Sequence, residues 1–304
     1  MKNKNIKGLE GNLLIRNKIL KDRFSNSVFY KIDSDHINKS SDEISFLAFI
    51  YTLRGFSSID IPTCQKIISE TKKAISSAMY KAKELDLGLE TIPLLITSIR
   101  SSMVCEESET IFKSKLNQIL DSGIDAFELH IDIIDLNIIK HQLNILKLHL
   151  PNQIISISIS RKNLSNALML EVIRSAYEII KKELIVEVNE IDEITSNINM
   201  NTTLQTISTA DIINKQLKSE HLKFKKIPII LAGGTNELTS RLAEQCGVPF
   251  NGITFKPDKS EISNYSSKKY YEITNEEIIY SIEVTKKLLN KVLINKKDSL
   301  NPIV

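Results

Sequence analysis

Short apolar segments of strand length alternate with longer segments of helical periodicity along most of this chain, and the pair recurs eight times. A helix-length segment follows each apolar segment, and no two of the segments are joined by a hairpin signal. Strands that are always separated by helices pair in parallel, so the pattern predicts an α/β fold with an all-parallel sheet. The eight predicted strands are residues 27–33, 57–61, 92–98, 126–132, 154–160, 184–189, 227–232 and 252–256.

Eight strand–helix pairs are the number that closes a barrel, so we expect a TIM-barrel-like (β/α)8 fold. Residues 27–304 then form a single domain, which is long enough to bury a sizeable core. Residues 1–26 are polar and lysine-rich and are predicted to be an N-terminal arm. A doubly wound open sheet is the alternative fold for the same pattern.

Local signals mark several helix boundaries. Ser40 and Glu43 have the spacing of a capping box, and Thr274 and Glu277 repeat it near the end of the chain. Gly55 and Gly123 follow predicted helices as C-terminal stops. Proline is tolerated in a first helical turn, so the helix after the second strand is predicted to begin at Pro62.

The composition is that of a soluble globular protein, with 42% apolar and 25% charged residues. A net charge of +3 gives no reason to expect binding to nucleic acid or to a membrane. No apolar run reaches the roughly 18 residues of a membrane-spanning helix, and the charged start does not resemble a signal peptide. The cysteines Cys64, Cys105 and Cys246 are far apart, which indicates a reducing cytoplasm rather than a disulfide framework.

The fourth predicted strand has two different faces. Its apolar face is expected to pack under the helices and comprises Phe127, Leu129 and Ile131. Its other face carries Glu128 and His130, which would point into a barrel, where charged groups need partners or water. The pair is a candidate for acid–base catalysis or ligand contact. A buried hydrogen-bonded pair with Lys31 or Arg100 is the structural alternative.

Further polar residues are expected at the same end of the barrel, because such folds carry their chemistry at the carboxyl ends of the strands. These residues are Asp60, Glu187, Asn189 and Lys256, and one face of the fifth strand adds Ser156, Ser158 and Ser160. The sequence contains no metal-spaced histidine pair, no Ser-His-Asp order and no Walker-type loop, so no metal site is predicted.

Two glycines end the seventh strand, in a chain that has nine glycines in all. Gly233 and Gly234 are followed by Thr235 and Asn236 at the start of a predicted helix over residues 237–247. Exposed N–H groups and the positive end of a helix dipole suit an anion, so these four residues are a candidate site for a small anionic ligand. Ordinary turn chemistry accounts for the same pattern.

Several stretches, taken in order, resemble the light-dependent period protein (LdpA) family of cyanobacteria. Residues 46–61 resemble that family's helix and strand ending in AYTLAGADCIDVA, and residues 123–130 resemble its G-x-D-A-x-E-I-H. Residues 230–236 and 252–255 resemble its LAGGTN and the following GVAFGSYAR. The resemblance implies a barrel-like fold, a role in tuning the circadian clock to light through redox state, and association with clock proteins.

The chain departs from the family at its cofactor. The family carries a cysteine-rich insertion with two iron–sulfur clusters between the third strand and the next helix. Here residues 98–108 bridge the two elements directly, and Cys105 is their one cysteine. Since a [4Fe–4S] cluster normally takes four thiolates, we expect no iron–sulfur cluster and no other cofactor.

Two loops also depart from the family pattern. Residues 190–201 replace a glycine-rich loop, and Lys256-Pro257 replaces Gly-Ser after the eighth strand. Both changes remove close approach of the backbone to a ligand. The resemblance therefore favours a non-enzymatic regulatory protein, a reduced and cluster-less relative of the family. The alternative is a barrel enzyme or sensor that binds a phosphorylated small molecule at Gly233-Gly234.

Overall fold

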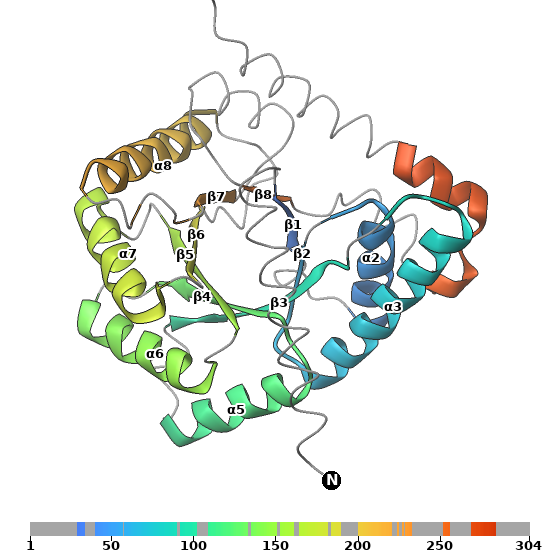
Figure 1. Ribbon diagram of the computed structural model, residues 1–304, viewed down its shortest axis with the longest axis horizontal. Helices are drawn as coiled ribbons and strands as arrows, with labels where there is room; N and C mark the ends of the chain where they lie inside the picture. Colours follow the sequence, from blue (N-terminus) through green and yellow to red (C-terminus); the bar gives the residue numbers. More distant parts are fainter. Residues whose placement is uncertain are drawn as a thin grey trace, which may run out of the picture.

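Eight parallel strands lie side by side in chain order in the computed structural model, and β8 pairs with β1, so the described strands close into a ring (Figure 1). The strands are β1 Phe29–Asp33, β2 Ser58–Ile61, β3 Leu94–Arg100, β4 Ala126–Ile131, β5 Ile154–Ser160, β6 Leu184–Asn189, β7 Ile229–Ala232 and β8 Gly252–Phe255. The prediction of an all-parallel sheet is confirmed. The structure describes residues 29–33, 40–56, 58–89, 92–101, 109–132, 135–150, 153–160, 164–181, 184–189, 200–220, 224, 227, 229–232, 252–255 and 269–283.

A helix follows each of the first six strands, which confirms the predicted alternation over that part of the chain. These helices are α2 Ser41–Leu53, α3 Gln65–Glu84, α5 Glu109–Asp121, α6 Leu136–His149, α7 Asn166–Ile180 and α8 Met200–Glu220. Residues 275–283 are helical as well. The predicted helix over residues 237–247 and the arm over residues 1–26 lie outside the described residues, so a complete (β/α)8 unit count stays a prediction.

The predicted helix signals are present as hydrogen bonds. In the first capping box Ser40 N donates to Glu43 Oε2 at 2.8 Å, and Glu43 N donates to Ser40 Oγ at 3.3 Å. The second box repeats this with Thr274 and Glu277, at 3.0 and 3.2 Å. Gly123 follows α5 at φ +79°, a backbone conformation that residues with a side chain rarely adopt.

The predicted start of α3 at Pro62 is wrong, because the helix begins at Gln65. Cys64 N donates to the Pro62 carbonyl at 2.8 Å, which closes a turn before the helix. The Thr63 hydroxyl donates to the Ser98 carbonyl of β3 at 2.7 Å and ties that turn to the sheet. This local turn and the tertiary bond from Thr63 hold residues 62–64 outside the helix.

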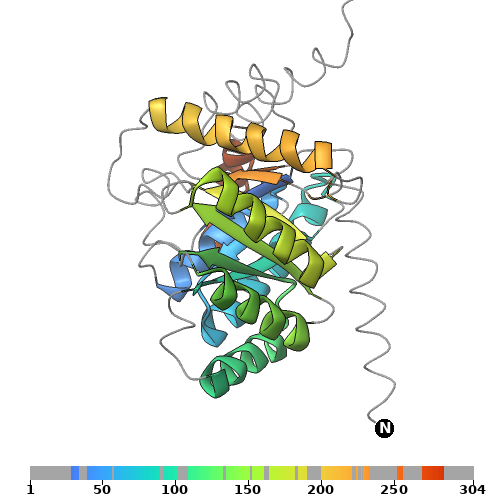
Figure 2. The same cartoon turned by 90° about the vertical axis from the view of Figure 1, so that its left-hand side faces the viewer.

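The core has two parts, one outside and one inside the ring of strands. Outward-facing strand residues, among them Phe127, Leu129 and Ile131, pack against the helices as predicted. Figure 2 shows α6, α7 and α8 side by side on the outer face of the strands, and adjacent members of this series are in contact. The inner part is a separate apolar layer made of Leu94, Ile96, Ala126, Ile154, Ile185 and Ile230.

An ion pair joins the outer helices α7 and α8. Arg174 Nε donates to Glu220 Oε2 at 2.7 Å, and a second guanidinium nitrogen contacts the other carboxylate oxygen. The hydrogen bond from Arg174 lowers the pKa of Glu220 below its ordinary value of 4.5. Both side chains remain about a third exposed, so water screens the pair.

We predict that Glu220→Gln destabilises the protein by no more than about 1 kcal/mol at pH 7, which is the range for an exposed ion pair. Because the folded-state pKa is lowered, the stabilisation is present above the unfolded-state pKa and is lost as the pH falls through the folded-state value. Urea unfolding of both proteins at pH 7 and pH 3 measures this difference. A gap between the two proteins that is as wide at pH 3 as at pH 7 would contradict the assignment.

Candidate functional site

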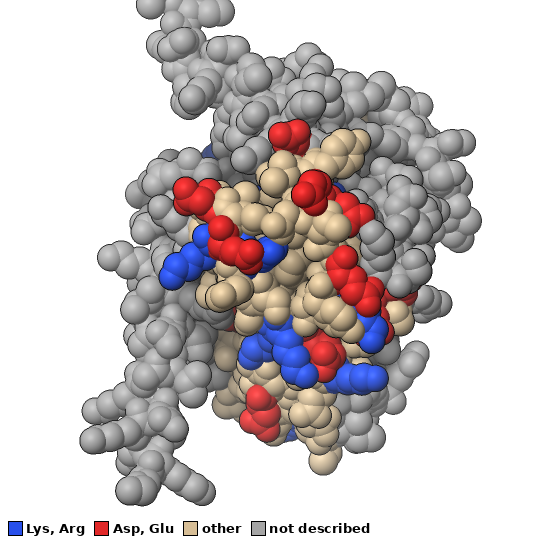
Figure 3. All heavy atoms as spheres, turned by 90° about the vertical axis from the view of Figure 1, so that its right-hand side faces the viewer, with Lys and Arg blue, Asp and Glu red and all other residues tan. Residues whose placement is uncertain are grey.

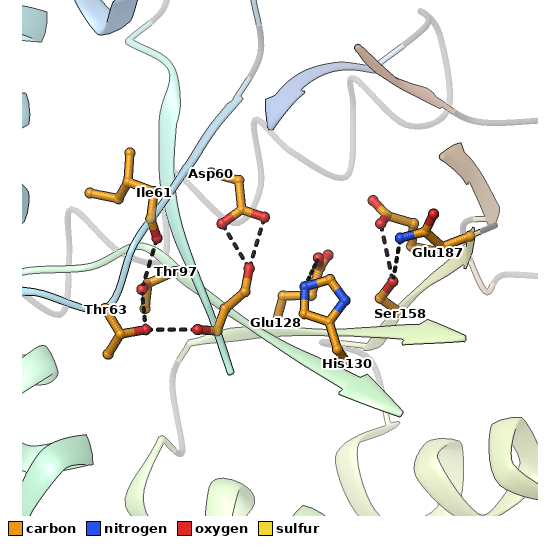
Figure 4. A network of polar contacts seen from close by, with 10 residues as sticks. Asp60, Ile61, Thr63, Thr97, Glu128, His130, Ser158 and Glu187 are labelled. Carbon is orange, nitrogen blue, oxygen red and sulfur yellow. Dashed lines mark hydrogen bonds and ion pairs between the residues drawn. The ribbon is translucent and has the colours of Figure 1, made fainter. Parts of the chain in front are cut away.

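The inner face of the strand ring changes from apolar to polar toward the carboxyl ends of β3 to β6, and β2 adds Asp60 to the polar part. Beyond the apolar layer, the inner side chains are polar and buried: Asp60, Ser98, Glu128, His130, Ser156, Ser158, Ser160, Glu187 and Asn189. The register places Ser98 opposite Glu128 and His130 opposite Ser158. Figure 4 shows the groups arranged from β2 to β6 across the ring. We call this set the inner polar layer.

The first group of the inner polar layer joins β2 to β3. Ser98 Oγ lies 2.8 Å from both carboxylate oxygens of Asp60, to which its hydroxyl donates (Figure 4). Asp60 is 1% exposed, so this charge depends on protein partners instead of water. Beside it, Thr97 Oγ1 lies 2.8 Å from Thr63 Oγ1 and 3.1 Å from the Ile61 carbonyl. The hydroxyls thus tie the turn after β2 to β3.

The second group is the pair on β4. His130 Nε2 lies 3.5 Å from Glu128 Oε1, with Glu128 1% and His130 7% exposed. Arg100 lies opposite His130 in the pairing of β3 with β4. The pair places an imidazole ring beside a carboxylate, two groups that acid–base catalysis uses.

The third group joins β5 to β6. Ser158 Oγ donates to Glu187 Oε1 at 3.2 Å, and Asn189 Nδ2 donates to Ser158 Oγ at 3.4 Å. Glu187 is 2% exposed. Each of the three buried carboxylates therefore has a partner on the same or an adjacent strand. This pattern keeps the cost of burying like charges within one narrow ring tolerable.

The space between these side chains at the strand ends is small. The cavity lined by Arg100, His130, Asp132, Ser158 and Asn189, among other residues, has a volume of about 10 Å³. That is room for about one water molecule. This gap is too small for a metabolite.

The structure brings together eight of the residues predicted from sequence at this end of the strands: Asp60, Glu128, His130, Ser156, Ser158, Ser160, Glu187 and Asn189. The other predicted site residues, Gly233, Gly234, Thr235, Asn236 and Lys256, lie outside the described residues, so they stay predictions. Within the part of the chain that is described, no three His, Cys, Asp or Glu side chains are grouped to hold a metal ion. The same part contains no helix long and apolar enough to cross a bilayer.

Sequence reasoning named His130 and Ser158 but missed Ser98, the partner of the Asp60 carboxylate. Ser98 was not singled out, although the two-residue alternation from Leu94 and Ile96 places it on the inner face. Thr63 and Thr97 carried no signal, because their bond depends on how the turn after β2 approaches β3. Once the register of β3 against β2 and β4 is known, Ser98 can be identified as a neighbour of Asp60 and Glu128.

We predict that Ser98→Ala destabilises the protein by about 1–3 kcal/mol, because it removes a donor from a buried carboxylate. Ser76→Ala is the matched control, since Ser76 is an exposed helical residue whose hydroxyl contacts only the helix backbone in the described structure. Alanine there should be neutral or slightly stabilising. Thermal and urea unfolding measure both variants, and equal stability of the two would refute the role given to Ser98.

Several solved structures share this fold. The carboxyl transferase domain of Rhizobium etli pyruvate carboxylase, in a Y628A variant with pyruvate, matches with a TM-score of 0.56 and 11% identity, over 91% of this chain and 50% of that chain. An aldolase named QR15 matches with a TM-score of 0.55 and 9% identity, over 88% and 96% of the two chains. A putative deoxyribose-phosphate aldolase from Coccidioides immitis matches with a TM-score of 0.55 and 8% identity, over 76% and 82%.

Identities this low show the fold alone. The chain also spans about half the length of the carboxyl transferase structure. No curated protein sequence matches the chain. Residues 118–264, however, match the family model for the light dependent period A C-terminal domain, and this match supports membership of the chain in that family.

Proposed function

We propose that the protein is a regulatory protein of the light dependent period A type that works without iron–sulfur clusters. The observation that carries the proposal is the family match over residues 118–264, which spans β4 to β8 and includes Glu128, His130 and Glu187. In this proposal the chain tunes the circadian clock to light and redox state by binding clock proteins in the cytoplasm. Its scaffold is a complete (β/α)8 barrel.

A regulatory role is favoured over catalysis by the state of the inner polar layer. Its three carboxylates are engaged by Ser98, His130 and Ser158. The gap among Arg100, His130, Ser158 and Asn189 has room for about one water molecule. Carboxylates that are already engaged within the layer support a regulatory role over a catalytic one.

The absence of a cluster is the first prediction of this proposal. Protein purified without oxygen should be colourless, with no absorbance band near about 400 nm and less than stoichiometric iron, because three dispersed cysteines do not supply four thiolates. Elemental analysis and an absorbance spectrum measure this, with a ferredoxin prepared in parallel as the positive control. Stoichiometric iron bound to the monomer would contradict the proposal that the protein has no iron–sulfur cluster.

The second prediction concerns partners. Tagged protein incubated with cyanobacterial extract should retain clock proteins, and the amount retained should differ between cells taken in the light and in the dark. Quantitative mass spectrometry of the bound fraction measures this, with an unrelated barrel protein carrying the same tag as control. If the bound fraction matches that of the control under both conditions, the proposed regulatory role has no support.

One observation favours a second candidate function. The Glu128–His130 pair lies at the carboxyl ends of the strands, where barrel enzymes place their chemistry, and two of the fold neighbours are named as aldolases. An enzyme or sensor for a phosphorylated small molecule would then use Gly233-Gly234 as its anion site. A thermal-shift response to sugar phosphates that Gly234→Asp removes would favour this candidate over the regulatory one.

A further inference from the structure

A cavity of about 410 Å³ lies beside the ring, between the first turns of α3, the end of α5 and the end of β3. We call it the α3–α5 cavity. Its volume falls within the range of about 300–1,000 Å³ that small-molecule sites occupy. The contrast with the 10 Å³ space at the strand ends is large. If a small molecule binds to the described part of this chain, this cavity has the room for it.

The lining of the α3–α5 cavity is rich in hydrogen-bond donors and contains no carboxylate among the described residues. Arg100 and His130 enter it from the strand ends, and three isoleucines supply an apolar wall. Amides and hydroxyls complete the polar part, among them Gln65, Gln118, Thr63 and Ser122. A guanidinium fork with amide and hydroxyl donors around it binds phosphate or carboxylate oxygens.

The start of α3 adds to the same preference without carrying the argument. Cys64 is the N-cap residue and makes no side-chain capping bond, and the first turn of α3 contains no acidic residue. Gln65, the first residue of that turn, also lines the cavity. The positive end of the helix dipole therefore borders the space that Arg100 reaches.

The surrounding surface does not account for this chemistry. On the face that carries α2 and α3, Lys and Arg side chains lie beside Asp and Glu side chains (Figure 3). Lys73, for example, contacts Glu70 at 2.8 Å. Lys72 donates to the Ser122 and Gly123 carbonyls at the end of α5, at 3.1 and 3.4 Å. A preference for anions would thus come from the cavity and not from a general positive patch.

We propose that the α3–α5 cavity binds a small organic anion carrying a phosphate or carboxylate group, with Arg100 supplying the charge and Gln65 and Gln118 supplying amide donors. This proposal uses other residues than the predicted anion site at Gly233-Gly234 and goes beyond the regulatory function proposed above. His130 lines the cavity and also contacts Glu128. A bound anion therefore lies next to the inner polar layer and stabilises the folded ring by mass action.

The test is isothermal titration calorimetry at constant ionic strength with glucose 6-phosphate, citrate and inorganic phosphate, and with glucose as the uncharged control. We expect wild-type protein to bind glucose 6-phosphate or citrate with a dissociation constant below about 1 mM, and glucose not to bind. Binding of inorganic phosphate alone would show that the charged group suffices. No binding of any of the three anions at this level overturns the proposal.

Gln65→Glu is the decisive variant, because its effects on folding and on binding should be opposite. A carboxylate in the first turn of a helix is favoured by the dipole, so the melting temperature should be kept or raised. The same carboxylate faces the bound anion and should weaken its binding about tenfold or more. Gln216→Glu on α8 is the matched control, since Gln216 is exposed and outside the cavity lining, and it should leave binding unchanged.

Two further variants separate the possible sites. Arg100→Gln should also weaken binding about tenfold or more, by removing charge-assisted hydrogen bonds. Gly234→Asp should leave binding as in the wild type, because it alters the loop after β7. Equal weakening by Gln65→Glu and Gln216→Glu would reveal a general charge effect, and loss of binding in Gly234→Asp would place the anion at the glycine loop. Either result overturns the α3–α5 site, and neither bears on whether the protein binds clock partners.

Discussion

The narrow interior of a closed ring of parallel strands is the constraint on which the rest of this structure depends. Every second residue of each strand must point into that interior, which is just wide enough for side chains to fill. Near the amino ends of β3 to β7 the inner residues are apolar and need no partners: Leu94, Ile96, Ala126, Ile154, Ile185 and Ile230. Nearer the carboxyl ends they are polar, so each buried carboxylate must find its partner on the same or an adjacent strand. The pairs Asp60–Ser98 and Glu187–Ser158 are solutions to that requirement.

Much of this arrangement was predictable, because hydrophobic alternation and capping are local properties of the sequence. The alternation in β4 separated Phe127 and Leu129 from Glu128 and His130, and the structure places the two sets on opposite faces. The Ser40–Glu43 capping box needs only four consecutive residues to form. Parallel pairing followed from the helices between strands, so most of the inner polar residues could be expected at one end of the sheet.

What could not be predicted depends on distances between segments that are far apart in the sequence. The bond from Ser98 to Asp60 joins residues 38 positions apart, and it exists only at one register of β2 against β3. Helix α3 begins at Gln65 and not at the predicted Pro62, because the Thr63 hydroxyl donates to the Ser98 carbonyl of a neighbouring strand. The α3–α5 cavity is even harder to predict from the sequence. Its lining comes from two helices and two strand ends, and no local pattern encodes the distances between them.

The two ends of the ring interior contribute differently to the stability of the folded protein. That difference indicates which end carries function. Three carboxyl side chains at 1–2% exposure stabilise the folded ring less than apolar side chains of similar volume would. The apolar layer of the same ring shows that such a filling is compatible with these strands. Departures from the most stable choice concentrate at functional sites. They lie here at the carboxyl end, where His130 contacts Glu128 of the inner polar layer and also lines the α3–α5 cavity, so the layer and the cavity share a side chain.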